Sequence, residues 1–187
     1  MRSSRVASAL HIVGKNSHET PSPPDIMPPH TRGADPAMTD PIVYADDLQP
    51  GQRHELGIHT VSESELVDFA SQWDPQAFHV DRAAAESGAF GGLIASGIHS
   101  LAIAQRLAVS SVLTSWSVIA GRRLREMEFL APVRPGDTLS GSMRIESVDL
   151  DPRGRGLVTY TTELVNQAGV AVLRFDADVY LRSRGTH

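Results

Sequence analysis

The sequence predicts an α+β domain in which an antiparallel sheet wraps around one long central helix. Residues 97–112 are apolar on several faces when placed on a helix, which is typical of a helix enclosed on most sides. Beyond residue 120, apolar and polar residues alternate through several segments with turn sequences between them. This alternation indicates an antiparallel sheet with one face on the core and the other in water. The two patterns together are those of the α+β class.

A helix is also predicted before the central one, following a first strand at residues 52–60. Ser62 followed by Glu65 matches a capping box, which marks a helix N-terminus. The apolar face of this helix comprises Leu66, Val67, Phe69, Ala70 and Trp73. Because Pro75 disfavours helical geometry at the residue before it, the helix is expected to end near Trp73.

Four strands are predicted after the central helix. They cover residues 122–129, 139–146, 157–165 and 173–181, with turns at 132–137, 151–156 and 166–169. In the last strand, apolar residues such as Leu173 and Phe175 alternate with polar residues such as Arg174. Because successive side chains of a strand point to opposite faces, one face of this sheet is expected to cover the central helix.

Composition and charge exclude several classes of protein. At 187 residues the chain is long enough for one domain with its own core. Its 41% hydrophobic and 21% charged residues are typical of a soluble globular protein, and no apolar run approaches the roughly 18 to 20 residues of a membrane span. The formal charge of −5 argues against a nucleic-acid partner. We therefore expect a cytoplasmic protein that binds neither nucleic acid nor membrane.

Cysteine and histidine usage bears on metal and redox chemistry. The chain has no cysteine, which excludes disulfides, thiol nucleophiles and thiolate metal sites. Its eight histidines are scattered, and none forms a ligand pair such as H-x-x-x-H. We expect neither a metal nor a redox cofactor.

Residues 1–40 differ in composition from the rest of the chain. They are rich in Ser, Pro, Gly and His and show no sustained apolar period. Such a segment buries too little surface to offset the entropy of ordering it. We predict a disordered tail at residues 1–40 and a single domain at residues 41–187. Met38 is an alternative translation start.

The segment from Phe69 to Ser100 holds the residues with the clearest chemical meaning. Asp74 and His79 lie five residues apart across a turn that contains a proline. A glycine-rich loop and then the central helix follow directly, so that an acid/base pair precedes a helix N-terminus with free backbone N–H groups. Chemistry on a carbonyl compound needs these parts.

These residues resemble a known family. DPQAFHVD at residues 74–81 and GAFGGLIASGI at residues 88–98 are similar to the hydratase motif D-x-N-P-x-H-x-D and the stretch G-F-x-x-x-I-A-H-G-M that follows it. Both belong to the MaoC-like dehydratases, or (R)-specific enoyl-CoA hydratases, which have the hot-dog fold. PVRPGDTL at residues 132–139 also looks like the entry to the family's later strands. The similarity covers about residues 45 to 183.

The resemblance implies reversible addition of water to a trans-2-enoyl thioester, giving a 3-hydroxyacyl thioester. The catalytic residues it implies are Asp74, His79 and Gly97, and the substrate-binding residues are Gln76, Phe78, Phe90 and Ser96. The acyl group is carried as a thioester of CoA or of acyl carrier protein. CoA is then part of the substrate rather than a cofactor. A homodimer that pairs two sheets side by side is also implied, and the unpaired edges of a single sheet favour the same arrangement.

This chain departs from the family pattern at three positions. Gln76 stands in place of Asn, Ala77 in place of Pro, and Ser96 in place of the His found in many members. Asp74 and His79 are retained. These departures leave the reaction class unchanged and put the substrate in question.

The residues also have simpler structural interpretations. As an aspartate before a proline, Asp74 could merely begin a turn, but with His79 and the glycine-rich loop beside it the catalytic interpretation is favoured. Asp81 is expected to cap a short helix, Ser96 can cap the central helix, and packing or capping is favoured for His99 over a role as a second base. Asp74 lies at a helix C-terminus, where the macrodipole and partial burial both disfavour its charge, so its pKa is expected to be raised.

Three functions are compatible with the motif. The first is a hydratase in which Asp74 and His79 hold the attacking water. The second is a hot-dog thioesterase, in which the carboxylate directs water to the carbonyl carbon. The third is a protein that binds acyl thioesters without turning them over. The spacing of Asp74 and His79 within one turn favours the hydratase.

Overall fold

The computed structural model of the protein describes residues 41–184, and the predicted tail at residues 1–40 lies outside them. The helices are η1 (Ala45–Asp47), α1 (Glu63–Trp73), α2 (Ala77–Val80), α3 (Arg82–Ser87), α4 (Gly97–Ala108) and η2 (Val109–Leu113). The strands are β1 (Arg53–Thr60), β2 (Val118–Phe129), β3 (Thr138–Asp151), β4 (Arg155–Val165) and β5 (Ala171–Arg182).

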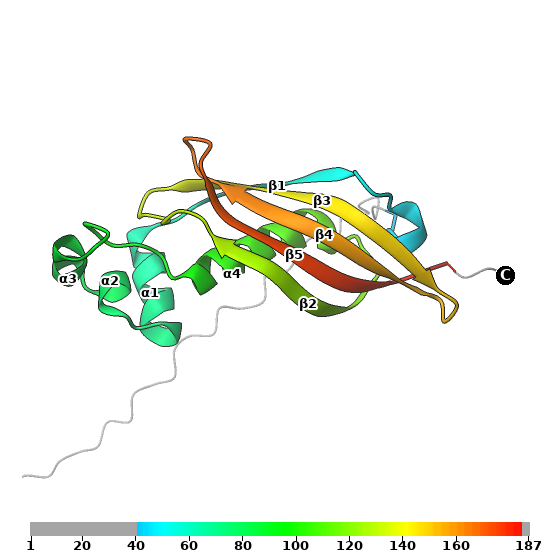
Figure 1. The fold of residues 1–187 in the computed structure, drawn as a ribbon, viewed down its shortest axis with the longest axis horizontal. Helices are drawn as coiled ribbons and strands as arrows, with labels where there is room; N and C mark the ends of the chain where they lie inside the picture. The colour runs from blue at the N-terminus through cyan, green and yellow to red at the C-terminus, as the bar shows by residue number, and fades with distance from the viewer. Residues whose placement is uncertain (1–40, 185–187) are drawn as a thin grey trace, which may run out of the picture. The chain divides into compact units, whose positions relative to one another are not determined.

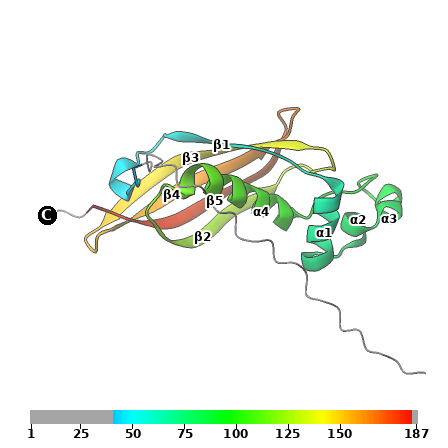
Figure 2. The ribbon, with the colours of Figure 1, turned by 180° about the vertical axis from the view of Figure 1, so that it is seen from behind.

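The five strands form one antiparallel sheet in the order β1-β3-β4-β5-β2. Helix α4 lies against one face of this sheet, and α1, α2 and α3 lie beyond its N-terminal end (Figures 1 and 2). The predicted α+β class, with a sheet wrapped on a central helix, is confirmed. The two outermost strands are β1 and β2, so these carry the free edges of the sheet.

The core lies between α4 and the sheet, and the alternation of the strands decides which side chains enter it. Along β4 every second residue is buried, including Val158, Tyr160, Thr162 and Leu164. From the helix, Ile103 and Leu107 meet the same cluster. The side chains that point to the opposite face along β4 are half-buried, as expected for the solvent-facing side of a sheet.

Tyr160 lets the stability of this core be tested at alkaline pH. Burial raises the pKa of its phenol to about 12, whereas the ordinary value is 10.0. The unfolded chain therefore loses this proton first, so the stabilisation is complete below pH 10 and is lost as the pH rises towards 12. The free energy of unfolding in urea should fall between pH 10 and pH 12 for both the wild type and Tyr160→Phe. The fall should be smaller for Tyr160→Phe than for the wild type, by about 2–3 kcal/mol. Parallel curves for the two proteins would contradict this.

The central helix is shorter and less enclosed than the sequence predicted. It ends at Ala108 and continues as a π-helical turn, η2, rather than as α-helix to residue 112. Ile98 is 53% exposed and Val109 is 42% exposed, so one apolar stripe of the helix faces away from the sheet. The prediction that the helix is wrapped on most sides was wrong, because a single sheet covers one side of it.

Other differences occur at the ends of elements. Trp73 was placed on the apolar face of α1 but is 72% exposed, because it is the last residue of the helix before the chain turns. The other tryptophan, Trp116, is buried, with 6% of its surface exposed. Strand β2 begins at Val118, four residues earlier than predicted, and its pairing with β5 shifts register three times. Helix α2 was not predicted, because a single helical turn is too short to show a period.

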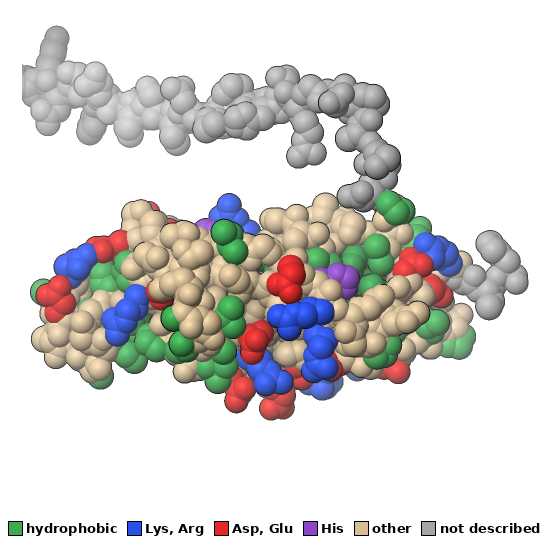
Figure 3. All heavy atoms as spheres, turned by 90° about the horizontal axis from the view of Figure 1, so that it is seen from above, with side chains coloured by type: hydrophobic (Ala, Val, Ile, Leu, Met, Phe, Trp, Pro, Cys, Tyr) green, Lys and Arg blue, Asp and Glu red, His purple; other side chains and the backbone are tan. Residues whose placement is uncertain are grey.

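Charges on the described surface are mixed in sign. Arg53 pairs with Glu55 at 3.0 Å and Arg144 with Glu146 at 2.9 Å. Figure 3 shows the same mixing on one face, where basic and acidic side chains lie next to each other. Among the described helices, none has the length and apolar character needed to cross a membrane.

Candidate active site

Asp74 is held where α1 ends. The helix starts at a cap in which the Ser62 hydroxyl accepts the Glu65 N–H at 3.2 Å, as the capping pattern predicted. Its last N–H bond runs from Asp74 to the Ala70 carbonyl at 2.8 Å, and Pro75 prevents it from continuing. The Asp74 side chain is 26% exposed and can therefore reach both the protein and a bound molecule.

His79 lies on α2 and is buried, with 4% of its surface exposed. Its Nδ1 lies 2.7 Å from the carbonyl oxygen of Ile94. A carbonyl can only accept, so Nδ1 carries the hydrogen and Nε2 of the neutral ring is a lone-pair acceptor. This Nε2 lies 3.4 Å from Oδ2 of Asp74. The two side chains predicted to be catalytic are therefore brought together.

The Asp74 carboxylate receives a hydrogen bond on each oxygen. Gln76 Nε2 donates to Oδ1 at 2.8 Å, and the Ser96 hydroxyl donates to Oδ2 at 2.7 Å. These two bonds, helped by the nearby His79 ring, outweigh partial burial and lower the pKa of Asp74. The expectation of a raised pKa was wrong, because hydrogen bonds to the charged form outweigh the effects of burial and the helix C-terminus. Asp74 is a carboxylate at neutral pH.

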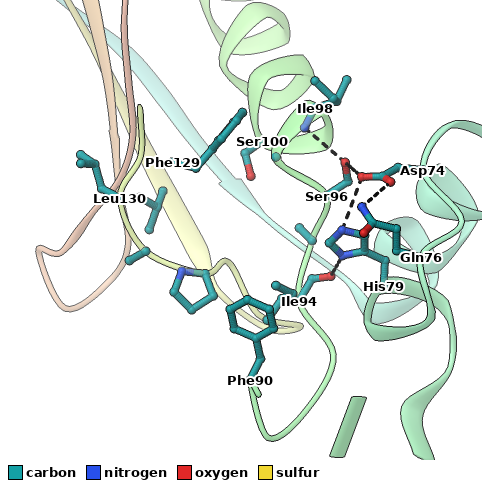
Figure 4. Close-up of a pocket in the computed structure, with 15 residues that line it drawn as sticks. Asp74, Gln76, His79, Phe90, Ile94, Ser96, Ile98, Ser100, Phe129 and Leu130 are labelled. Carbon is teal, nitrogen blue, oxygen red and sulfur yellow. Dashed lines mark hydrogen bonds and ion pairs between the residues drawn. The ribbon is translucent and has the colours of Figure 1, made fainter. Parts of the chain in front are cut away.

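The residues predicted for the site line one pocket of about 480 Å³ (Figure 4). Six of the seven are in its lining: Asp74, Gln76, His79, Phe90, Ser96 and Gly97. The seventh, Phe78, lies outside the lining and packs against His79, with ring centroids 4.3 Å apart. Phe78 therefore packs against the His79 ring, and the prediction that it contacts substrate has no geometric support.

The opposite wall of the pocket was missed by sequence reasoning. It comes from the end of β2, the loop after it, and β5, and includes Phe129, Leu130 and Val172. In Figure 4, Phe129 and Leu130 lie across the pocket from Asp74 and His79. No local motif marks these apolar residues, because strand pairing alone brings them to the site. The result is a pocket that is polar on one side and apolar on the other.

Gly97 is the first residue of α4, so its N–H has no partner within the helix. A Cβ at this position would lie 2.7 Å from Cε1 and Cζ of Phe129. The close approach of this ring explains why a glycine stands here. Ser96 caps the same helix by accepting the Ile98 N–H at 3.2 Å while it donates to Asp74. One hydroxyl thus connects the helix N-terminus to the carboxylate.

Asp81 and His99, which lie in the segment from Phe69 to Ser100, have structural roles. Asp81 caps α3 by accepting the Ala84 N–H at 3.1 Å, as predicted. His99 is 4% exposed and stacks on Phe69, which agrees with the packing role expected for it. Within residues 41–184, no group of three or more His, Asp or Glu side chains has the arrangement of a metal site.

Comparison with known proteins shows which family the chain is similar to. The model of the MaoC-like domain family matches residues 47–168. The uncharacterised protein YdeM of Bacillus subtilis is 33% identical over 139 residues, covering 73% of this chain and 97% of that protein. An (R)-specific enoyl-CoA hydratase of Rhodospirillum rubrum is 29% identical over 143 residues, covering 76% of this chain and 94% of that enzyme.

A solved structure shows the same fold. The crystal structure of a MaoC-like dehydratase from Rhodospirillum rubrum superposes with a TM-score of 0.70 at 34% identity, covering 77% of this chain and 99% of that one. The family model covers the segment that holds Asp74, His79 and Gly97. The chain therefore belongs to the MaoC-like domain family, with the hot-dog fold of its dehydratases.

Proposed function

We propose that the protein adds water reversibly to the double bond of a trans-2-enoyl thioester, giving a 3-hydroxyacyl thioester. The observation that carries the proposal is the pair formed by Asp74 Oδ2 and His79 Nε2, which lie 3.4 Å apart in the lining of an otherwise mostly apolar pocket. The hydratase and dehydratase names of its relatives support the same reaction class.

The geometry of the pair suits a bound water molecule. Asp74 is an ionised carboxylate, and the reaction uses the neutral form of His79, in which Nε2 has a lone pair, so in that form the two groups offer acceptors and no hydrogen between them. A water molecule has two hydrogens and can donate one to each. This water is then oriented with its oxygen lone pairs directed into the pocket, towards the β-carbon of a bound enoyl group.

The reaction follows from these positions. His79 Nε2 takes a proton from the water as its oxygen bonds to the β-carbon, and the electrons of the double bond move to the thioester oxygen. The Gly97 N–H, at the N-terminus of α4, stabilises this enolate oxygen. The imidazolium of His79, stabilised by the Asp74 carboxylate, returns the proton to the α-carbon. Atoms and charge balance, and the reverse sequence removes water.

The apolar wall accounts for binding of the acyl group. Phe129, Leu130 and Val172 face the polar side of the pocket, so the carbon chain can lie against them while the thioester reaches α4. Phe90, which is 41% exposed, lies within the glycine-rich loop and also lines the pocket. CoA or acyl carrier protein, which carries the acyl group, then remains outside the pocket.

A paired assay on a short trans-2-enoyl-CoA tests the function. Loss of the enoyl chromophore and release of free thiol are followed together in the same reaction. The proposal expects loss of the chromophore without thiol. Thiol release would instead make the protein a thioesterase, and binding of the acyl-CoA without either signal would make it a non-catalytic binder.

Replacement of Gly97 with Ala tests the oxyanion position. The added methyl group meets the Phe129 ring at 2.7 Å, so either the ring or the helix N-terminus must shift within the pocket. We expect kcat/KM to fall at least about tenfold, because small displacements of reacting groups are costly. The Phe129→Ala substitution removes the clashing ring. In that background, Gly97→Ala should therefore lower kcat/KM much less than it does in the wild type. An equal loss in both backgrounds would show that the methyl group acts in another way.

We also propose that the protein is a homodimer joined along β2. This edge strand exposes Val118, Ile119 and Leu124, and the neighbouring stripe on α4 exposes Ile98. Apolar residues along an unpaired edge favour pairing with a second strand. The same face includes Phe129 of the pocket, so a second copy would lie close to the acyl group.

Sedimentation analysis of two matched variants tests this interface. Ile119→Asp on β2 is expected to give a folded monomer, because a charge would be buried between the copies. Ile58→Asp on the opposite edge strand, β1, replaces an isoleucine that is 69% exposed and should remain dimeric. A monomer with Ile58→Asp and a dimer with Ile119→Asp would move the interface to β1.

A further inference from the structure

A second cluster of titratable side chains lies outside the pocket and is not used by the proposed mechanism. Glu65 of α1 lies between two histidines, with Oε1 at 2.9 Å from His59 Nε2 and at 3.3 Å from His99 Nε2. His59 comes from β1 and His99 from the first turn of α4. One carboxylate therefore connects β1 and α1, which are consecutive in the sequence, to the more distant α4.

The charges in this cluster can be assigned. Burial opposes ionisation of Glu65, but hydrogen bonds from His59 and His99 outweigh it and lower the pKa of the carboxyl group. Burial lowers the pKa of His99, although Glu65 acts in the opposite direction and His59 in the same one. A neutral His99 must then donate its Nε2 hydrogen to the Glu65 carboxylate. Its Nδ1 is left as a buried atom with no partner in residues 41–184.

His99 also makes a stacked ring contact between α1 and α4. It stacks on Phe69 of α1 with centroids 4.6 Å apart and ring planes inclined by 11°. A histidine that only packed here would lower the stability of the fold, because its unpaired nitrogen is buried. An apolar side chain would leave no such atom in the core. The hydrogen bond to Glu65 is what an apolar ring could not supply.

The two helices joined by His99 carry the two halves of the active site. Helix α1 ends next to Asp74, and α4 begins at Gly97. Figure 2 shows α1 beside the N-terminal end of α4. At the pocket, the ends of these helices are linked by the hydrogen bond from Ser96 to Asp74. Away from the pocket, the link is His99 with Glu65 and Phe69.

We propose that His99 is a positioning residue, which holds the N-terminus of α4 at a set distance from Asp74 through its hydrogen bond to Glu65. This inference rests on the proposed hydratase function. His99 lies three residues after Ser96, in the turn that presents the Gly97 N–H, so a shift of its ring moves the oxyanion donor relative to the carboxylate. Substrate binding to the apolar wall does not depend on this distance, whereas the chemical step does.

Three variants separate positioning from packing. His99→Phe keeps an aromatic ring to stack on Phe69 and removes the hydrogen bond to Glu65. His99→Gln restores an N–H donor of similar reach. His59→Gln is the matched control, because it alters the other partner of Glu65 and leaves α4 untouched. Steady-state kinetics on the short enoyl-CoA are measured for each, together with thermal unfolding, at a temperature where all the proteins are folded.

We expect His99→Phe to lower kcat on the order of tenfold with KM within about twofold of the wild type, since misplacement of reacting groups affects the chemical step. His99→Gln should recover most of kcat, and His59→Gln should keep it. A His99→Phe protein with altered unfolding temperature but wild-type kcat would overturn the proposal, as would equal losses in His59→Gln. Wild-type protein without loss of the enoyl chromophore would instead overturn the hydratase function itself.

Discussion

Replacement of Asp74 with Asn is expected to lower kcat for enoyl-thioester hydration about a thousandfold, within the 10²- to 10⁴-fold range of general acid–base catalysis. The amide has nearly the same shape as the carboxylate, so the pocket is preserved. It has no negative charge to stabilise the imidazolium of His79, whose Nε2 lies 3.4 Å away. It also loses one of the two acceptor oxygens that Gln76 and Ser96 now hold in place.

The chromophore assay measures this effect, with KM expected to stay within a few-fold because Asp74 is not on the apolar wall. Asp81→Asn is the matched control, since Asp81 lies in the same segment but caps α3. It should keep near wild-type kcat, with at most a loss of about 1 kcal/mol in stability. An Asp74→Asn enzyme with more than a tenth of wild-type kcat would remove Asp74 from the mechanism.

Replacement of His79 with Ala is expected to reduce kcat by a similar factor, about 10²- to 10⁴-fold. The change removes the Nε2 base, and it also leaves the buried Ile94 carbonyl without the Nδ1–H that it now accepts at 2.7 Å. His79→Gln tests the two losses separately, because its amide can still donate to Ile94 but cannot take up a proton. Both variants should therefore lose kcat, while His79→Gln should keep more of the stability.

The double variant Asp74→Asn/His79→Gln gives the sharper result. If one water is held between the two side chains, either substitution alone releases it, and the second adds little. We expect kcat of the double variant to lie within a few-fold of the weaker single variant, since residues that act as a unit are not additive. Fully multiplicative losses would show that Asp74 and His79 act in separate steps.

Local signals in the sequence were sufficient for the bounds of α1 and for the start of α3, but not for α2, which carries His79. The cap at Ser62 and the proline at Pro75 bounded α1, and Asp81 capped α3 as expected. These features depend on hydrogen bonds and backbone sterics within a few residues, so they can be recognised without tertiary structure. The π-helical turn after Ala108 and the early start of β2 were missed, because packing rather than local preference sets them.

By itself, the sequence determined the α+β class, the family resemblance, and the six predicted residues that meet in one pocket. Each of these depends on periodicity or on a short motif. The tertiary structure decided the lowered pKa of Asp74, because the hydrogen bond from Gln76 is joined by one from Ser96, which lies 22 residues away. It also decided the apolar wall with Phe129 and the link from His99 to Glu65. Such contacts act through space, where distance and burial set their strength, and no spacing along the chain encodes them.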